Sequence, residues 1–219
     1  MQRWIVAIDG PAGAGKSTVA RLLADRLGYI YLDSGAMYRC VALVALRTGT
    51  EPEESTALAE AAQITFDPAG IGEPQRVFLG DEDVSQAIRT PEVSLMASKV
   101  AAIPGVRTAL VRLQQALGAQ GGVVMEGRDI GTVVFPQAEL KIFLTASPEE
   151  RARRRHAELE ARGEVFDYAR VLADLKERDE RDETREASPL KPAPDAITFL
   201  TDGRTIEQIV MELAGKVEA

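Results

Sequence analysis

The sequence predicts an α/β fold in which helices cover both faces of a parallel β-sheet. Two patterns predict this class. Short apolar segments typical of buried strands alternate with helical segments along most of the chain, an order that favours a parallel sheet. A glycine-rich stretch also lies between the first of these strands and the first helix. With 219 residues, 45% of them hydrophobic, the chain can bury one sizeable core.

The glycine-rich stretch reads GPAGAGKS from Gly10 to Ser17 and fits the G-x-x-x-x-G-K-[ST] pattern of a phosphate-binding P-loop. Its glycines allow backbone N–H groups to converge on an anion, and the following helix adds its positive N-terminal end. Lys16 can reach the β- and γ-phosphates, and the Ser17 hydroxyl can ligate Mg²⁺. The predicted fold is therefore a P-loop NTPase-type parallel sheet, and a nucleoside triphosphate is its expected ligand.

The remaining elements follow from hydrophobic periodicity and from turn residues. Buried strands are expected at 4–8, 29–32, 122–125, 140–144 and 197–200. Helices are expected at 17–27, 36–47, 52–62, 91–101, 104–117, 148–162, 166–186 and 205–217, with Ser34 capping the second. Short strands at 63–66, 76–79 and 82–84 are separated by Pro, Gly and Asp turns and predict a small antiparallel sheet.

This pattern divides the chain into a core and two additions. Residues 1–62 and 101–219 are expected to form the P-loop core, and residues 63–100 an insert that holds the small sheet and a helix. Within the core, residues 151–186 are a helical region in which nine arginines lie between Arg151 and Arg185. Several have an acidic residue four positions before them, which favours simple pairs on solvated helix faces. Their concentration in an acidic protein favours a helical lid in which a minority neutralise a transferring phosphoryl group.

Composition excludes several classes of function. A net charge of −8 disfavours non-specific binding to nucleic acid, whose phosphates require a basic face. No apolar run approaches the ~18 residues of a membrane span and no signal-peptide pattern begins the chain, so a cytoplasmic location is expected. No heptad or long apolar stripe is present, which predicts a monomer. The lone cysteine, Cys40, is expected in the core, and the lone histidine, His156, on a solvated helix face.

Two polar turns follow buried strands and are expected to face the same crevice as the P-loop, because ligands bind at the carboxyl ends of parallel strands. The first, DSGAMYR from Asp33, offers Arg39 to a phosphate and Tyr38 to a base or sugar. The second, EGRD, presents Arg128 and Asp129 after the most apolar strand. The alternatives are an ordinary capped helix with a solvated arginine for the first and a surface ion pair for the second.

Five segments together resemble the bacterial cytidylate kinase family, from about residue 4 to the C-terminus. They are the P-loop, DSGAMYR, V-x-x-x-P-x-V-R, GRDIGTVVFP and RDERDETREASPL. The resemblance implies a nucleoside monophosphate kinase of pyrimidine nucleotide metabolism that transfers the γ-phosphoryl group of ATP to CMP or dCMP with Mg²⁺. It also implies that residues 63–100 are the acceptor-nucleotide-binding insert and that the partners are small nucleotides.

The resemblance implies a role for each matching residue. The ATP phosphates would be bound by a run of the loop and one lid arginine: Gly10, Pro11, Ala12, Gly13, Ala14, Gly15, Lys16, Ser17, Thr18 and Arg154. The acceptor would be held by Ser34, Arg39, Ser98, Arg107, Arg128, Asp129, Arg178, Asp182 and Arg185, of which Ser98, Arg107 and Asp129 would read the cytosine. The catalytic residues would be Lys16, Arg128, Arg154 and Arg185. Ser17 is a candidate Mg²⁺ ligand, and Glu126 is given no metal role.

Three other functions use the same loop. Another nucleoside monophosphate kinase is the nearest, although the lid cysteines of an adenylate kinase are absent. A GTPase switch is disfavoured because the chain has no N-K-x-D guanine signal. A non-catalytic, ATP-gated binding module would not need the lid arginines, since a sensor neutralises no transition state.

Overall fold

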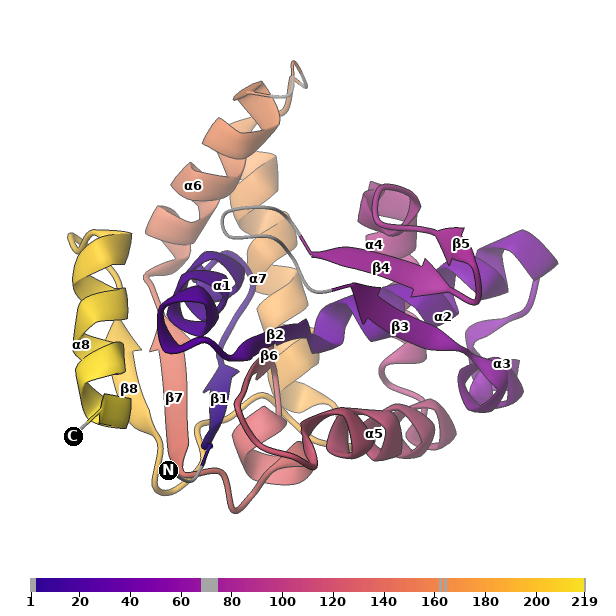
Figure 1. The fold of residues 1–219 in the computed structure, drawn as a ribbon. Coiled ribbons are helices and arrows are strands. Elements are labelled where there is room, and N and C mark those ends of the chain that lie inside the picture. Colours follow the sequence, from indigo (N-terminus) through magenta and orange to yellow (C-terminus); the bar gives the residue numbers. More distant parts are fainter. Residues whose placement is uncertain (1–2, 68–74, 162, 164, 219) are drawn as a thin grey trace.

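The five predicted buried strands form one parallel sheet (Figure 1). The structure is a computed structural model and describes residues 3–67, 75–161, 163 and 165–218. The strand order is β2-β6-β1-β7-β8, so β6 lies between the first two strands of the chain. The strands are β1 (Ile5–Asp9), β2 (Ile30–Asp33), β6 (Val123–Gly127), β7 (Leu140–Thr145) and β8 (Ile197–Leu200). The predicted parallel α/β class is confirmed.

Helices bury both faces of the three central strands, β6, β1 and β7. Val6 and Ile8 of β1 pack with α1 and α8 on one face. Ala7 points to the opposite face and packs with residues of α5 and of a one-turn π-helix, η3. Burial on both faces is the reason the strands read as continuous apolar runs. These helices are α1 (Lys16–Leu27), α5 (Pro104–Gly118), η3 (Ile130–Val134) and α8 (Ile206–Glu218).

The edge strands are less covered, since only Leu32 of β2 and only Phe199 of β8 are buried. The prediction of a buried strand at 197–200 is therefore wrong in its burial, because the sheet ends at β8.

The predicted small sheet is antiparallel and pairs in the order β3-β4-β5 (Figure 1). The helix that follows it, α4, packs along α2 of the core. Buried side chains of the small sheet, α2, α4 and α5 form one hydrophobic cluster, so the insert shares its core with α2. The elements of this region are α2 (Ser34–Thr48), η1 (Pro52–Glu54), α3 (Thr56–Ala61), β3 (Ile64–Asp67), β4 (Arg76–Leu79), β5 (Glu82–Asp83), η2 (Ala87–Arg89) and α4 (Pro91–Val100).

Two arginine-rich helices project as a pair from the carboxyl end of the main sheet (Figure 1). They are α6 (Pro148–Ala161) and α7 (Tyr168–Thr184). The residue that was expected to end the first of them, Arg162, lies outside the described residues. A small apolar cluster fills the space between the two helices, and it includes one residue of the P-loop: Ala12, Ala152, Leu159, Val171 and Leu175. The P-loop therefore packs into the core of the helical pair.

The cap of α2 differs from the prediction. The N-cap is Asp33, whose side chain accepts a hydrogen bond from the backbone N–H of Ala36 at 3.0 Å. Ser34 is instead the first residue of the helix. An aspartate one residue earlier competes well for this position, because its carboxylate is a strong acceptor for the first free N–H groups. The Ser34 hydroxyl is thereby left for a different contact.

Cys40 is completely buried, as predicted, and burial raises the pKa of its thiol to about 12. His156 does not occupy the solvated position predicted for it. Its side chain is 25% exposed, its Nε2 lies 2.9 Å from the carbonyl oxygen of Phe166, and its ring meets the Tyr168 ring edge-on. The start of α7 folds back against α6 and covers the ring. Within the described ranges, no helix combines the length and apolar character needed to cross a membrane.

Candidate active site

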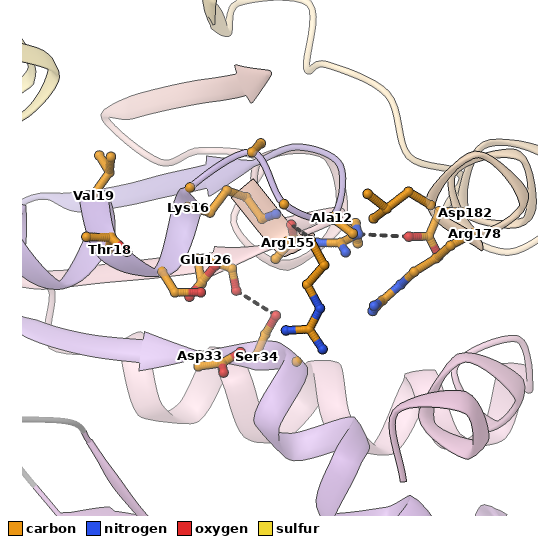
Figure 2. Close-up of a pocket in the computed structure, with 18 of the residues that line it drawn as sticks. Ala12, Lys16, Thr18, Val19, Asp33, Ser34, Glu126, Arg155, Arg178 and Asp182 are labelled. Atoms are coloured by element: carbon orange, nitrogen blue, oxygen red, sulfur yellow. Dashed lines mark hydrogen bonds and ion pairs between the residues drawn. The ribbon is translucent and has the colours of Figure 1, made fainter. Parts of the chain in front are cut away.

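A cleft of about 900 Å³ lies where β1, β2 and β6 end, between the P-loop, α2, α4 and the α6–α7 pair (Figure 2). Both predicted polar turns open into it, as expected for the carboxyl ends of parallel strands. Eighteen of the predicted site residues line the cleft: Ala12, Gly13, Ala14, Gly15, Lys16, Ser17, Thr18, Ser34, Tyr38, Arg39, Ser98, Arg107, Arg128, Asp129, Arg154, Arg178, Asp182 and Arg185. Gly10 and Pro11 are not among the lining residues.

Gly10 and Pro11 support the P-loop on the side away from the cleft. Gly10 has a φ of 147° and packs so closely against β7 that a Cβ would lie 1.9 Å from the carbonyl oxygen of Leu144. Only glycine fits there. The carbonyl oxygen of Pro11 accepts a hydrogen bond from Lys16 Nζ at 2.7 Å. These two residues therefore set the position of the loop and of its lysine.

Lys16 is only 6% exposed and sits at the N-terminal end of α1, beside the cleft (Figure 2). Burial and, next, the charge of Arg128 lower the pKa of its ammonium group from 10.5 to about 7. A phosphate bound in the loop would favour the charged form again, because an opposite charge nearby stabilises it. The buried ammonium group of Lys16 is thus placed where a bound anion would stabilise its charged form.

Asp9, directly before the loop pattern, does not line the cleft but supports the segments that do. Its carboxylate is 3% exposed and accepts hydrogen bonds from the backbone N–H groups of Ile130 at 2.8 Å and Gly131 at 2.7 Å. These bonds fix the segment that directly follows Arg128 and Asp129 against the start of the P-loop. Burial raises the pKa of Asp9 from 3.8 to about 6, although the two N–H groups oppose the rise. Its position at the end of a buried strand is the one signal in the sequence.

The first polar turn and the end of β6 are tied together beside the P-loop. The Ser34 hydroxyl donates to the backbone carbonyl of Glu126 at 2.7 Å, and the Glu126 carboxylate accepts a hydrogen bond from the Tyr31 hydroxyl (Figure 2). Burial and the neighbouring charge of Asp33 raise the pKa of Glu126, while hydrogen bonds from Ser17 and Tyr31 oppose the rise. Ser17, Asp33 and Glu126 thus bring together oxygen atoms of the kind that Mg²⁺ prefers.

Arg39 extends from α2 with part of its guanidinium unused. Its Nη2 pairs with Asp33 at 2.5 Å, but its buried Nε has no hydrogen-bond partner among the described residues. Tyr38 lies next to it under the Arg107 guanidinium, which is 5.5 Å from the ring centroid. Burial raises the pKa of the Tyr38 hydroxyl to about 12. The first polar turn therefore places a cation and an aromatic ring at the cleft, and their roles toward a ligand stay a prediction.

Arg107 and Asp129 form an ion pair whose side chains are 5% and 6% exposed. Arg107 also donates to the carbonyl oxygen of Ala101 and to the hydroxyl of Ser188, both at 3.2 Å. Ser98 of α4 lines the same cleft. The surface-pair alternative for Asp129 is wrong, because the pair is buried. A carboxylate, a guanidinium and a hydroxyl offer both acceptors and donors to a polar ring edge.

The wall formed by α7 carries donors without partners. Asp182 accepts a hydrogen bond from Arg128 Nε at 2.8 Å. The Nε of Arg178 and the Nη2 of Arg185 are buried, and neither finds a partner in the part of the chain that the structure describes. Burial and, next, the charge of Arg128 lower the pKa of Arg178 to about 10. Buried donors are costly to leave unpaired, and these two project from the α7 side where a bound anion would satisfy them.

Three arginines of α6 occupy three different environments. Arg154 faces the cleft, pairs with Glu150 at 2.8 Å and donates to the hydroxyl and carbonyl oxygens of Thr201 at 2.9 and 3.2 Å. Arg153 is 67% exposed and pairs with Glu150, as the solvated alternative predicts. Arg151 is buried and reaches the P-loop. No sequence signal separates Arg151 from its neighbours, since all of them share the same helical pattern.

The fold and the cleft together define a class. A phosphate-binding loop that faces buried arginines across a cleft at the carboxyl end of a parallel α/β sheet is the arrangement of a P-loop phosphotransferase. The family model described as cytidylate kinase matches residues 6–219. The chain belongs to the cytidylate kinase family, and the resemblance predicted from its motifs is confirmed.

Individual relatives agree with this assignment. The cytidylate kinase of Pelotomaculum thermopropionicum is 52% identical over 219 residues, covering 98% of this chain and 96% of the relative. That of Geobacter sp. strain M21 is 53% identical over 209 residues, covering 94% and 89%. Among solved structures, a shikimate kinase from Bacteroides thetaiotaomicron has a TM-score of 0.50 at 13% identity and covers 99% of each chain. That likeness supports the fold alone.

Proposed function

We propose that the protein transfers the γ-phosphoryl group of ATP to CMP or dCMP and releases ADP and CDP or dCDP. One observation carries the proposal: the P-loop and the arginine-bearing wall of α7 face each other across a single cleft that also contains the buried Arg107–Asp129 pair. One side of this cleft suits a triphosphate, and the other suits a nucleoside monophosphate. The family to which the chain belongs is named for the same activity.

The donor side consists of the loop and Arg154. The triphosphate lies along residues 12–18, where backbone N–H groups and the N-terminus of α1 favour anions. Arg154 reaches the donor phosphates by exchanging its bonds to Thr201. The Ser17 hydroxyl and the phosphates would hold Mg²⁺ on this side, because this ion prefers oxygen ligands and is commonly bound through substrate phosphates. When bound, the ion would neutralise phosphate charge.

The acceptor side consists of the α7 wall, the insert at 63–100 and the two polar turns. Arg39, Arg128, Arg178 and Arg185 supply donors for the phosphate of the nucleoside monophosphate, and Asp182 and Ser34 position its sugar and phosphate. Cytosine needs an acceptor for its exocyclic amine and donors for its ring N3 and O2. Asp129 supplies the acceptor, while Arg107 and Ser98 supply the donors. The ion pair between Asp129 and Arg107 would hold this acceptor and this donor side by side before cytosine binds.

The reaction needs no covalent intermediate. Positioning brings an oxygen of the acceptor phosphate in line with the γ-phosphorus. Lys16, Arg128, Arg154 and Arg185 neutralise the charge that spreads over the transferring group. The α6–α7 region at 151–186 acts as the lid that excludes water, which strengthens each of these electrostatic contacts.

A coupled assay of ADP release tests this function. CMP and dCMP should support ADP production well above UMP and AMP. Arg128→Ala should lower kcat by orders of magnitude, because it removes a charge beside the transferring group and unpairs Asp182. Arg170→Ala, at an exposed position of α7, is the matched control and should retain activity. ADP production that is independent of every acceptor, or equal for CMP and AMP, would refute the proposal.

A further inference from the structure

Arg151, in the first turn of α6, is the one fully buried member of a row of four arginines at positions 151, 153, 154 and 155. Its side chain is 5% exposed, against 67% for Arg153. We propose that Arg151 is a positioning residue that links the P-loop to Arg178, so that binding of the donor strengthens binding of the acceptor. The inference rests on the proposed function, because it concerns how the two nucleotide sites communicate.

The guanidinium of Arg151 joins three separate parts of the molecule. Its Nε donates to the carbonyl oxygen of Ala146, just after β7, at 3.0 Å. Its Nη1 donates to the carbonyl oxygen of Ala12 in the P-loop at 3.1 Å and pairs with Asp179 of α7 at 2.5 Å. A planar, always charged group with fixed donors suits such a junction, and a lysine does not reproduce it. A shift of the P-loop at Ala12 would therefore move the Arg151 guanidinium and, through Asp179, displace α7.

Apolar packing supports the same connection. Ala12 belongs to the small cluster between α6 and α7, so its methyl group and its carbonyl oxygen both contact the helical pair. At the next position, a Cβ on Gly13 would lie 3.2 Å from the Cβ of Arg151. The loop and the start of α6 are therefore in close contact, with little free space between them. Interiors packed in this way transmit displacement instead of absorbing it.

The neighbour of Asp179 in α7 carries the effect to the acceptor wall. Successive residues of a helix project about 100° apart, so the contact that fixes Asp179 also fixes the direction of Arg178. Arg178 projects from α7 into the cleft (Figure 2). Lys16 and Arg178 line the same cleft, close enough for the charge of Arg178 to add to burial and Arg128 in lowering the pKa of Lys16. Donor phosphates bound at Lys16 would attract the Arg178 guanidinium and favour the geometry in which it meets an acceptor phosphate.

Binding measurements test the link directly. The dissociation constant of CMP is measured by calorimetry with and without an ATP analogue whose γ-phosphoryl group cannot be transferred. Coupling between two sites is typically about 5- to 150-fold and reciprocal. We expect the analogue to tighten CMP binding at least about 5-fold in the wild-type protein. The same factor should appear when CMP is held constant and the analogue is titrated.

The informative variant replaces the buried pair with apolar side chains, Arg151→Met with Asp179→Leu. Such replacements commonly preserve folding, whereas removing one partner leaves a buried charge. We expect the tightening to fall below about 2-fold in this variant. Arg181→Met with Glu177→Leu is the control, because it removes an exposed pair of the same helix, 3.6 Å apart, and should keep the wild-type factor.

Each outcome decides the matter. An unchanged factor in the Arg151→Met/Asp179→Leu protein, or no tightening in the wild type, would overturn the inference. Equal loss in the control would also overturn it, since the effect would then belong to α7 in general. An intermediate factor for Arg151→Lys would support it, because lysine keeps the charge but cannot reach all three acceptors at once. Failure of the wild type to phosphorylate CMP would refute the proposed function instead, which separates the two claims.

Discussion

The carboxylate of Asp9 makes the fold less stable at neutral pH than at pH 4. Its pKa is raised from 3.8 to about 6, chiefly by burial. Between these values the folded state keeps a proton that the unfolded chain has lost, so the contribution of Asp9 to the free energy of unfolding falls as pH rises. The difference between 3.8 and about 6, at about 1.4 kcal/mol per pKa unit, amounts to about 3 kcal/mol.

Asp9→Asn should remove this dependence, because an amide does not titrate. The other groups titrate in both proteins, so the difference between the two isolates Asp9. The full difference of about 3 kcal/mol is reached only well below pH 3.8, so we expect the free energy of unfolding of the wild type, minus that of the variant, to be about 2 kcal/mol more favourable at pH 4 than at pH 7. Urea unfolding followed by circular dichroism at pH 4, 5, 6 and 7 measures it. Parallel curves for the two proteins would refute the reasoning.

The same substitution should impair the reaction at every pH. The two oxygens of Asp9 each accept one backbone N–H, from Ile130 and Gly131. An asparagine keeps one oxygen and turns its amide donor toward the other N–H, so one bond is lost. Because these bonds hold the segment that follows Asp129, we expect KM for CMP to rise more than KM for ATP. Asp9→Asn thus distinguishes the effect of Asp9 on the free energy of unfolding, which depends on pH, from its effect on KM for CMP, which does not.

Three further predictions concern the buried groups. Lys16→Ala should lower kcat by orders of magnitude in the ADP-release assay, because it removes a cation beside the transferring group. Cooperative urea unfolding should stay intact, because a buried charge is costly to the fold. Wild-type turnover would contradict the prediction. Asp129→Ala should relax the preference for CMP over UMP and destabilise the fold by roughly 3–5 kcal/mol, because Arg107 is left buried without its partner. Adding Arg107→Met should recover stability but not base preference, and recovery of both would place base reading elsewhere. Cys40→Ser should cost about 1–3 kcal/mol by burying a hydroxyl in the apolar core, and a thiol reagent should label Cys40 in the wild type only on unfolding.

The sheet and the two polar turns could be predicted because each depends on local pattern. Strands buried on both faces appear as apolar runs, and the carboxyl ends of parallel strands must meet at one edge. Arg128 and Asp129 could therefore be placed in the cleft with Arg39 before any contact was known. The family assignment added Ser98 and Arg107, which periodicity alone does not distinguish from neighbouring residues of their helices.

Asp9 and Arg151 could not be predicted because their roles depend on distant partners. The N–H group that Asp9 binds at Ile130 is 121 residues away along the chain. Arg151 is 139 residues from Ala12, and its helix offers several arginines with equivalent spacing. The cap of α2 was misassigned for a different reason, since Asp33 and Ser34 are adjacent and both suit the position. Only their partners in three dimensions decide between them.

The place of β6 between β1 and β2 has a consequence for synthesis on the ribosome. β1 and β2 emerge first, but neither pairs with the other, and the strand that joins them begins only at Val123. Until then both strands present unpaired edges, which are liable to aggregate. The cluster of α2, α4 and α5 needs nothing beyond Gly118 and is free to assemble earlier. A nascent chain would therefore acquire the side of its cleft formed by α2 and α4 well before its P-loop has a sheet to support it.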